Sequence, residues 1–170
     1  MNGPDLWRQS MARIVDRDTL ITLLQPQRRA GAQVVFTNGC FDLLHAGHVR
    51  YLMDARSEGD LLVIGLNTDA SVRLLKGPTR PFIPEMERAA MLASLRCVDY
   101  VCLFGEPTAA PLVDLLRPDV YVKGGDYDIA EIPEGRVVAA YGGRLVKGLF
   151  VEGRSTSELS QRIAAALDNE

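Results

Sequence analysis

Histidine and cysteine are scarce in this sequence, and their scarcity narrows the chemistry that the chain can perform. Three cysteines, Cys40, Cys97 and Cys102, form an odd set without paired C-x-x-C spacing, which disfavours a disulfide framework and a zinc knuckle. The two histidines, His45 and His48, both lie in one short segment. Metal binding by Cys40 and these histidines is a competing interpretation, but a zinc site needs three or four converging ligands and no distant partner is marked.

Excess positive charge and long apolar runs are missing as well. The chain has 19 Lys and Arg residues against 22 Asp and Glu residues, which gives a formal net charge of −3. Nucleic-acid binding needs clustered basic residues with net positive charge, so no nucleic-acid partner is expected. No apolar run approaches membrane-spanning length, and the first ten residues lack the apolar core of a signal peptide. We therefore expect no membrane partner and a cytoplasmic location.

Along the chain, short apolar runs alternate with segments in which apolar residues recur at helical spacing. Residues 34–37 are β-branched and aromatic, and residues 61–66 form a continuous apolar run of the kind found in parallel strands covered on both faces. The repeated order of strand and helix predicts an α/β fold, a doubly wound, Rossmann-like domain with a parallel five-stranded sheet and helices on both faces. The expected strands cover residues 34–37, 61–66, 100–104, 120–122 and 143–146.

We divide the chain just before the first strand. Residues 1–32 are expected to be an N-terminal segment whose helix packs on the core, and residues 33–170 to be the main domain. Asp16 or Asp18 can cap that helix. Pro26 should end or kink it, because proline lacks the amide hydrogen that a helix interior uses.

Ligands of doubly wound sheets bind beyond the carboxyl ends of the strands, near a switch in strand order. The segments expected to meet at that edge are residues 38–48, Lys76, Lys123 and residues 155–157. The first strand-to-helix turn lacks G-x-G-x-x-G, and G-x-x-x-x-G-K-[ST] does not occur in the sequence. Ordinary dehydrogenases and P-loop kinases are therefore disfavoured.

The histidines stand three residues apart at the predicted start of a helix near Gly47. At that spacing both imidazoles can face the helix N-terminus, where unpaired amides and the helix dipole favour an anion, most simply a phosphate. Lys76 and Lys123 each stand beside a glycine in a strand-end loop and would add positive charge. The structural alternative is that His45 and His48 only fill the helix and that the lysines are solvated surface residues.

A cluster of hydroxyl residues precedes the last predicted helix. Ser155, Thr156 and Ser157 can be a simple N-cap, worth about 1 kcal/mol. They can also form a phosphate site, because a cap and a phosphate use the same helix amides.

The segment from Gly39 to His48, GCFDLLHAGH, resembles the G-x-F-D-x-x-H-x-G-H signature of the cytidylyltransferase-like nucleotidylyltransferases. From Gln33 onward, with LKGPTRP, KGGDY and EGRSTS, the chain is most similar to the ADP-heptose synthase branch, the heptose 1-phosphate adenylyltransferases. This resemblance implies that residues 33–170 are a nucleotidylyltransferase domain. It also implies transfer of AMP from ATP to D-glycero-β-D-manno-heptose 1-phosphate, giving ADP-heptose and pyrophosphate for lipopolysaccharide core or surface polysaccharide synthesis.

The resemblance also implies roles for individual residues. The predicted catalytic residues are His45, His48 and Lys76. The predicted nucleotide-binding residues are Thr37, Asn38, Gly39, Phe41, Gly47, Lys123, Gly124, Ser155, Thr156 and Ser157, and the predicted sugar-phosphate-binding residues are Asp42, Asn67, Arg80 and Asp126. No metal-ligating residue is predicted, and Mg²⁺ is expected to be held mainly by the ATP phosphates. A homo-oligomer, most simply a dimer, and a separate sugar kinase are also expected.

Two rival functions stay open. One is a CTP-dependent cytidylyltransferase that acts on glycerol 3-phosphate or a similar phospho-alcohol. Cytidylyltransferases of that type carry an arginine where Phe150 stands and an aspartate where Gly125 stands, so both departures disfavour CTP. The other is a non-catalytic nucleotide-binding module, which the retained histidines and lysines disfavour.

Overall fold

A computed structural model describes residues 5–11, 13–124, 128–148 and 156–167. Its centre is a five-stranded sheet in the order β3-β2-β1-β4-β5, in which every neighbouring pair is parallel. The strands are β1 (Val34–Gly39), β2 (Leu61–Asn67), β3 (Tyr100–Phe104), β4 (Val120–Lys123) and β5 (Arg144–Lys147). The predicted doubly wound sheet is confirmed.

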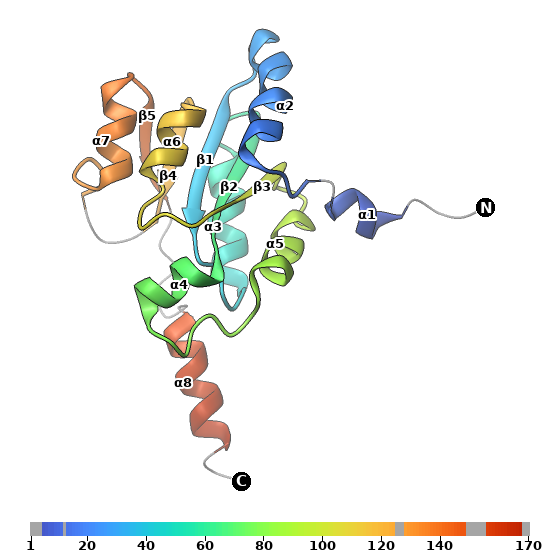
Figure 1. The fold of residues 1–170 in the computed structure, drawn as a ribbon, viewed down its shortest axis with the longest axis vertical. Helices are drawn as coiled ribbons and strands as arrows, with labels where there is room; N and C mark the ends of the chain where they lie inside the picture. Colours follow the sequence, from blue (N-terminus) through green and yellow to red (C-terminus); the bar gives the residue numbers. More distant parts are fainter. Residues whose placement is uncertain (1–4, 12, 125–127, 149–155, 168–170) are drawn as a thin grey trace.

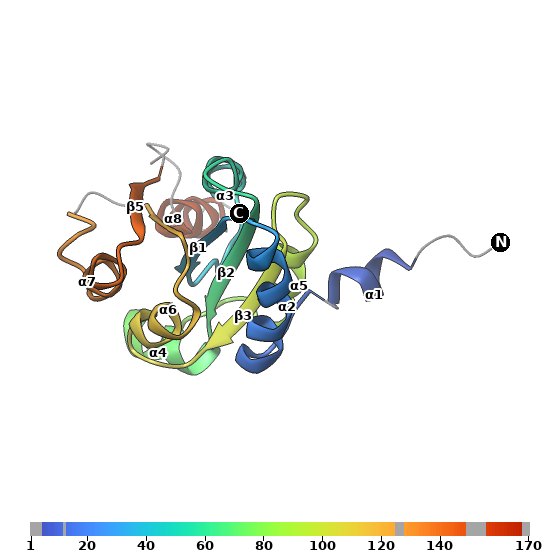
Figure 2. The ribbon, with the colours of Figure 1, turned by 90° about the horizontal axis from the view of Figure 1, so that it is seen from above.

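The helices lie on both faces of the sheet and beyond its edges (Figure 1, Figure 2). They are α1 (Leu6–Met11), α2 (Arg17–Arg29), α3 (Ala46–Arg56), α4 (Asp69–Lys76), α5 (Glu85–Ala93), α6 (Ala110–Leu116), α7 (Pro133–Ala140) and α8 (Thr156–Leu167). Helices α3 and α5 cover one face, whereas α2, α6 and α7 cover the other. No helix in the described part of the chain is long and apolar enough to cross a membrane.

Two apolar clusters hold these layers together, one on each face of the sheet. Successive strand residues point to opposite faces, so Val35 packs with Leu52 of α3, while Phe36 packs with Leu20 of α2 and Leu112 of α6. All five side chains are fully buried. Each such burial stabilises the fold by roughly 1.5–3 kcal/mol, so the sheet is a rigid platform for the loops at its carboxyl edge.

Pro26 was expected to end or kink α2, and the first alternative is wrong, because the helix continues through Pro26 to Arg29. Asp16 caps its start by accepting a hydrogen bond from the Thr19 amide at 2.7 Å. Leu20 and Leu24 anchor it in the core. Proline removes one helical hydrogen bond, and the burial of these two leucines in the preceding turns outweighs that loss.

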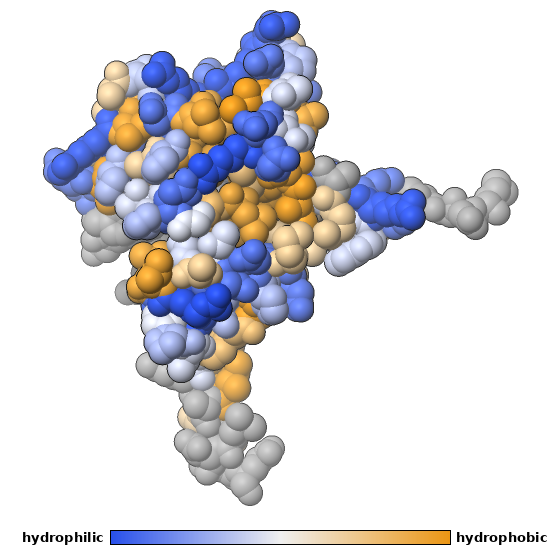
Figure 3. Space-filling view, in the orientation of Figure 1, coloured by the Kyte–Doolittle hydropathy of each residue, from blue (hydrophilic) through white to orange (hydrophobic). Residues whose placement is uncertain are grey.

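The N-terminal helix α1 stands apart from the body (Figure 1). It has no buried residue, and Trp7 is 63% exposed. Just after it, Ile14 pairs with Val101 beside β3, which attaches this part of the chain to the sheet. Hydrophobic residues gather on the surface where α1 joins the body (Figure 3). The division at residue 33 stays a prediction.

Candidate active site

The carboxyl ends of β1 and β4 meet at the point where the strand order reverses. The Tyr121 hydroxyl donates to Asn38 Oδ1 at 2.7 Å, and Lys123 Nζ donates to the Asn38 carbonyl at 3.3 Å. Burial lowers the pKa of Lys123, while Glu134 and Cys40 act in the opposite direction. A half-buried lysine at a switch point offers a positive charge that an anion can approach.

The turn after β1 brings both histidines to the N-terminus of α3. Phe41 adopts a left-handed backbone with φ of 46° and buries its ring, which reverses the chain toward the helix. His45 is the N-cap: its Nδ1 and its carbonyl accept from the His48 amide at 3.4 and 2.9 Å. The helix begins at Ala46, and Gly47 in its first turn is buried.

The two imidazoles stack, with ring centroids 3.9 Å apart, and Phe41 lies 5.4 Å from the His48 ring. Burial, then His45 and then Lys76, lower the pKa of His48 to about 4. His48 is therefore neutral near pH 7 in the unliganded protein. Its buried Nδ1 has no hydrogen-bond partner among the described residues. A bound anion would oppose the positive charges that depress this pKa.

Lys76 belongs to α4, the helix that follows β2. The sequence predicted it as the first residue of a loop, whereas in the structure it is the last residue of α4, and its side chain is exposed. Its charge helps to lower the pKa of His48, so the two side chains interact electrostatically. Gly77 follows with φ of +96°, a left-handed conformation that glycine adopts freely and that ends the helix.

Asp42 and Arg80, both predicted to bind the sugar phosphate, bind each other in this structure. Arg80 Nε donates to Asp42 Oδ2 at 2.6 Å, and the amides of Phe82 and Ile83 donate to Asp42 Oδ1 at 2.8 and 3.0 Å. The Arg80 guanidinium also lies over the Phe82 ring, 4.3 Å from its centroid. Both carboxylate oxygens of Asp42 thus hold the loop that follows Lys76. Direct contact of Asp42 or Arg80 with a sugar phosphate stays a prediction.

Arg88 was not among the predicted site residues, although it is fully buried beside the site. It donates to the Cys40 carbonyl at 2.6 Å, to the Ile83 carbonyl at 2.9 Å and to Asp69 Oδ1 at 2.7 Å. The sequence does place Arg88 beside apolar residues of α5. This position could have indicated a buried arginine, which needs hydrogen-bond partners in the core. Met86, an apolar residue of the same helix, is instead 48% exposed.

Three other side chains at this edge have structural partners. Asn67 is buried and donates to Ser71 Oγ at 2.8 Å. The Tyr51 hydroxyl donates to the Val122 carbonyl at 3.1 Å and lies 2.7 Å from Thr37 Oγ1. A Cβ at Gly124 would lie 3.2 Å from the Tyr51 ring, so a glycine there lets α3 pack closely on the end of β4. Tyr51 was not predicted as part of the site.

The last predicted phosphate motif is only partly described. Thr156 and Ser157 are the first residues of α8, which extends beyond the carboxyl edge of the sheet (Figure 1). Ser155 and Asp126 lie outside the described residues, as do Gly125 and Phe150. Their predicted roles therefore stay predictions.

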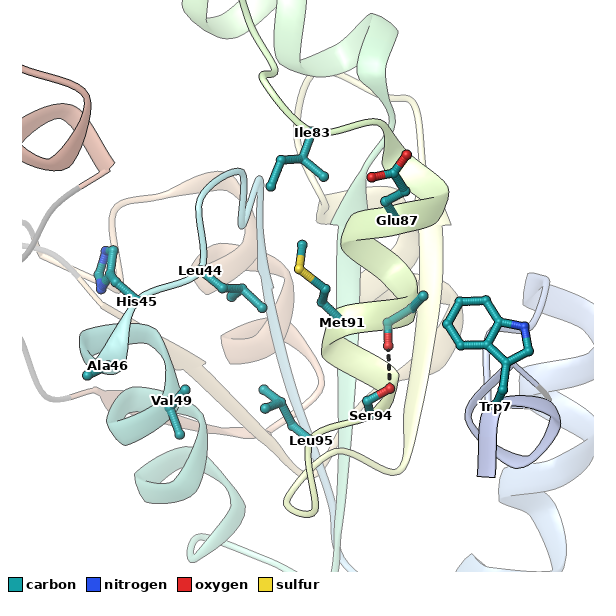
Figure 4. Close-up of a pocket in the computed structure, with 11 residues that line it drawn as sticks. Trp7, Leu44, His45, Ala46, Val49, Ile83, Glu87, Met91, Ser94 and Leu95 are labelled. Carbon is teal, nitrogen blue, oxygen red and sulfur yellow. Dashed lines mark hydrogen bonds between the residues drawn. The ribbon is translucent and has the colours of Figure 1, made fainter. Parts of the chain in front are cut away.

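An apolar groove of about 730 Å³ lies beside the histidines. His45 and Leu44 stand at one side of it, Met91 and Leu95 extend from the α5 side, and Trp7 lies beyond α5 (Figure 4). The described residues include no group of three or more His, Cys, Asp or Glu side chains that could hold a metal ion.

A parallel sheet in this order, with histidines at a helix N-terminus beyond its carboxyl edge, defines an α/β protein built to bind a phosphorylated ligand. A family model described as cytidylyltransferase-like matches residues 36–160. The chain belongs to this cytidylyltransferase-like family and is a nucleotidylyltransferase.

Curated relatives cover most of the chain. It is 56% identical over 147 residues to a bifunctional protein HldE of Syntrophotalea carbinolica, a match that covers 86% of this chain and 30% of that protein. A bifunctional protein HldE of Trichlorobacter lovleyi is 51% identical, with 92% and 32% covered. The chain thus spans about a third of the length of these relatives.

A solved structure also matches. It is the crystal structure of the lipopolysaccharide core biosynthesis protein from Thermoplasma volcanium GSS1, with a TM-score of 0.63 and 28% sequence identity. The match covers 72% of this chain and 100% of that one.

Proposed function

We propose that this chain transfers AMP from ATP to D-glycero-β-D-manno-heptose 1-phosphate, giving ADP-heptose and pyrophosphate for lipopolysaccharide core or surface polysaccharide synthesis. The observation that carries the proposal is the stacked pair His45 and His48 at the N-terminus of α3, within the field of Lys76. The relatives named bifunctional protein HldE and the solved structure titled as a lipopolysaccharide core biosynthesis protein support the choice of acceptor.

The reaction needs charge neutralisation more than proton transfer. An oxygen of the sugar phosphate attacks the α-phosphorus of ATP, a new P–O bond forms, the bond to the bridging oxygen of the β-phosphate breaks, and pyrophosphate leaves. The attacking phosphate is already ionised near pH 7, so no general base is required. His45, His48 and the α3 amides would meet the charge that develops at the α-phosphate, and Lys76 the charge on the leaving phosphates.

The perturbed pKa of His48 fits this role. In the free protein the imidazole is neutral, because burial and the neighbouring His45 and Lys76 disfavour its protonated form. The triphosphate brings negative charge to those neighbours and would raise the pKa of His48. Binding would then be coupled to proton uptake, and the protonated imidazole would donate hydrogen bonds from both ring nitrogens.

We propose that the remaining predicted residues surround the nucleotide and the sugar phosphate. Lys123 lies at the reversal point of the sheet, and Asn38 and Gly39 end β1 beside it. Thr37 is fully buried, so it would act by fixing the strand end through Tyr51. Mg²⁺ would be held mainly by the triphosphate oxygens and water, a donor set that the cation prefers, and it would neutralise phosphate charge.

The predicted cytoplasmic location and homodimer belong to the same proposal. The homodimer is implied by the family resemblance, whereas the cytoplasmic location was expected from the composition of the sequence. Fractionation and analytical ultracentrifugation would test them.

Competition kinetics test the choice of nucleotide. With heptose 1-phosphate as acceptor, kcat/KM for ATP should exceed that for CTP, and glycerol 3-phosphate should be a poor acceptor with either nucleotide. Equal or better turnover of CTP would favour the cytidylyltransferase alternative. Binding of ATP without pyrophosphate release from any pair would favour the non-catalytic module.

A further inference from the structure

Two segments from different strands must cooperate in the proposed reaction. The turn after β1 carries the histidines, and α4, which follows β2, carries Lys76 with the loop behind it. Lys76 is exposed at a helix end and is followed by a left-handed glycine, so its own backbone does not fix it against His48. The pairing of β1 with β2 ends at Gly39 and Leu66, so contacts beyond the strands must set how the turn and the end of α4 lie relative to each other.

Arg88 makes that contact. Its three hydrogen bonds reach the histidine turn at the Cys40 carbonyl, the lysine loop at the Ile83 carbonyl, and the first residue of α4 at Asp69. The planar guanidinium presents its donors in a fixed geometry, so these three groups are held at fixed separations from one another. A lysine could not hold all three with the same geometry.

Asp42 reinforces the connection from the other direction. It belongs to the histidine turn and accepts hydrogen bonds from the amides of Phe82 and Ile83 and from Arg80. The amide of Asp69 is held in turn by Glu85 at 2.6 Å. The turn, the start of α4 and the lysine loop therefore form one hydrogen-bonded unit with Arg88 at its centre.

We propose that Arg88 is a positioning residue for AMP transfer, which holds the histidine turn and the Lys76 segment at the separation that the reaction needs. This inference rests on the proposed function. Arg88 is fully buried, so it acts through other residues and does not touch the substrate. Misplacing a charged group by about 1 Å can cost roughly a hundredfold in rate, so a partial release of the lysine segment should be visible in kcat.

A double-mutant cycle tests this role. Arg88→Lys alone should lower kcat about tenfold or more with little change in the KM for ATP, because geometry and not charge is lost. In a Lys76→Ala background the same substitution should lower kcat far less, since the lysine to be positioned is gone. An equal loss in both backgrounds, or near-native kcat for Arg88→Lys, would overturn the proposal.

Arg28 provides the matched control. It is also an arginine that donates to two backbone carbonyls, those of Leu116 and Arg117, but it lies at the amino edge of the sheet. Arg28→Lys should lower Tm and leave kcat unchanged in both backgrounds. If Arg88→Lys does not fold, Asp69→Asn weakens the same unit from its exposed side and should show the same coupling to Lys76, at smaller amplitude.

A readout without turnover separates this inference from the proposed function. Lys76 is one of the groups that lower the pKa of His48, so Lys76→Ala should raise that pKa in an NMR titration. In the Arg88→Lys protein, Lys76→Ala should leave the pKa of His48 almost unchanged, because the lysine is no longer held nearby. If Lys76→Ala raises the pKa of His48 as much in the Arg88→Lys protein as in the unsubstituted chain, the inference is overturned. This outcome counts even if ATP and heptose 1-phosphate prove to be the wrong substrates.

Discussion

The two edges of the sheet use charge in opposite ways. At the amino edge, three aspartates accept hydrogen bonds from amides where strands begin: Asp60 from Gln33, Asp99 from Leu62, and Asp119 from Val34, each at 2.8 Å. At the carboxyl edge stand two imidazoles and two lysines. The amino edge thus uses its carboxylates to hold strand amides, whereas the carboxyl edge gathers imidazole and lysine side chains beside carboxylates that hold its loops.

The charged groups of the amino edge stabilise the fold, whereas those of the carboxyl edge are proposed to serve the reaction. The aspartates use backbone amides of their own chain as partners, and Arg56 also pairs with Asp99 at 3.3 Å. At the carboxyl edge the pKa of His48 and that of Lys123 are both lowered by burial, so the fold disfavours the charged form of each group. A bound polyphosphate would favour those charged forms. Substitutions at the two edges should therefore have different effects.

The largest expected effect is that of His48→Ala, which should lower kcat by about two to three orders of magnitude, the usual cost of removing one donor to a developing oxyanion. Tm should stay close to that of the unsubstituted chain, because the ring is only half-buried. Initial rates of pyrophosphate release and calorimetry measure both quantities. Near-native turnover with a Tm several degrees lower would show that His48 is a packing residue. The carboxyl edge would then serve stability, as the amino edge does.

Lys76→Ala should come next, with a loss in kcat of about ten- to a hundredfold and little change in the Kd for ATP. Lys76 is exposed and lies at a helix end, so it can move onto the leaving phosphates as their charge develops. Isothermal titration with ATP, beside steady-state kinetics, separates binding from turnover. Weak ATP binding with full turnover at saturation would instead place the lysine in ground-state binding.

Asp99→Ala probes the opposite edge. Loss of its bonds to the Leu62 amide and to Arg56 should lower the free energy of unfolding by about 1–2 kcal/mol. Urea denaturation gives this value. The kcat of the folded variant should not change, and a tenfold fall in kcat at native Tm would show that the amino edge also serves the reaction.

The last expected effect concerns pH, and it is absent near pH 7. The pKa of His48 is about 4 in the fold against 6.5 for an ordinary histidine, so the unfolded chain binds this proton first. Its contribution to stability is therefore complete above pH 6.5 and is lost as the pH falls toward 4. An NMR titration should find the lowered pKa, and saturating ATP should raise it. A pKa near 6.5 without ATP would contradict the burial of this ring.

The sequence predicted the fold well because local patterns determined it. Apolar runs such as residues 61–66 identified the parallel strands, and the two histidines identified the turn at the sheet edge. Pro26 misled because core packing of Leu20 and Leu24 outweighs one lost hydrogen bond. No local pattern shows that Arg88 reaches the Cys40 carbonyl, since that contact joins distant parts of the chain.

The hydrogen-bond partners of Asp42 could not be predicted for the same reason. Its place in the motif marked it as part of the site, and its burial against Arg80, Phe82 and Ile83 depends on how a distant loop returns to the turn. Tyr51 is similar, because its hydroxyl joins β1 to β4 only once α3 has packed on the sheet. Sequence patterns found the residues of one segment, and tertiary structure found the contacts between segments.

The most direct test of the central claim is product analysis with the purified chain, ATP, Mg²⁺ and D-glycero-β-D-manno-heptose 1-phosphate. ADP-heptose and pyrophosphate should form in equal amounts by mass spectrometry and a coupled pyrophosphate assay, with the rate reduced at least a hundredfold in His48→Ala. Absence of ADP-heptose under these conditions, or its formation at an equal rate by His48→Ala, would rule out the proposed transfer of AMP at the histidine turn.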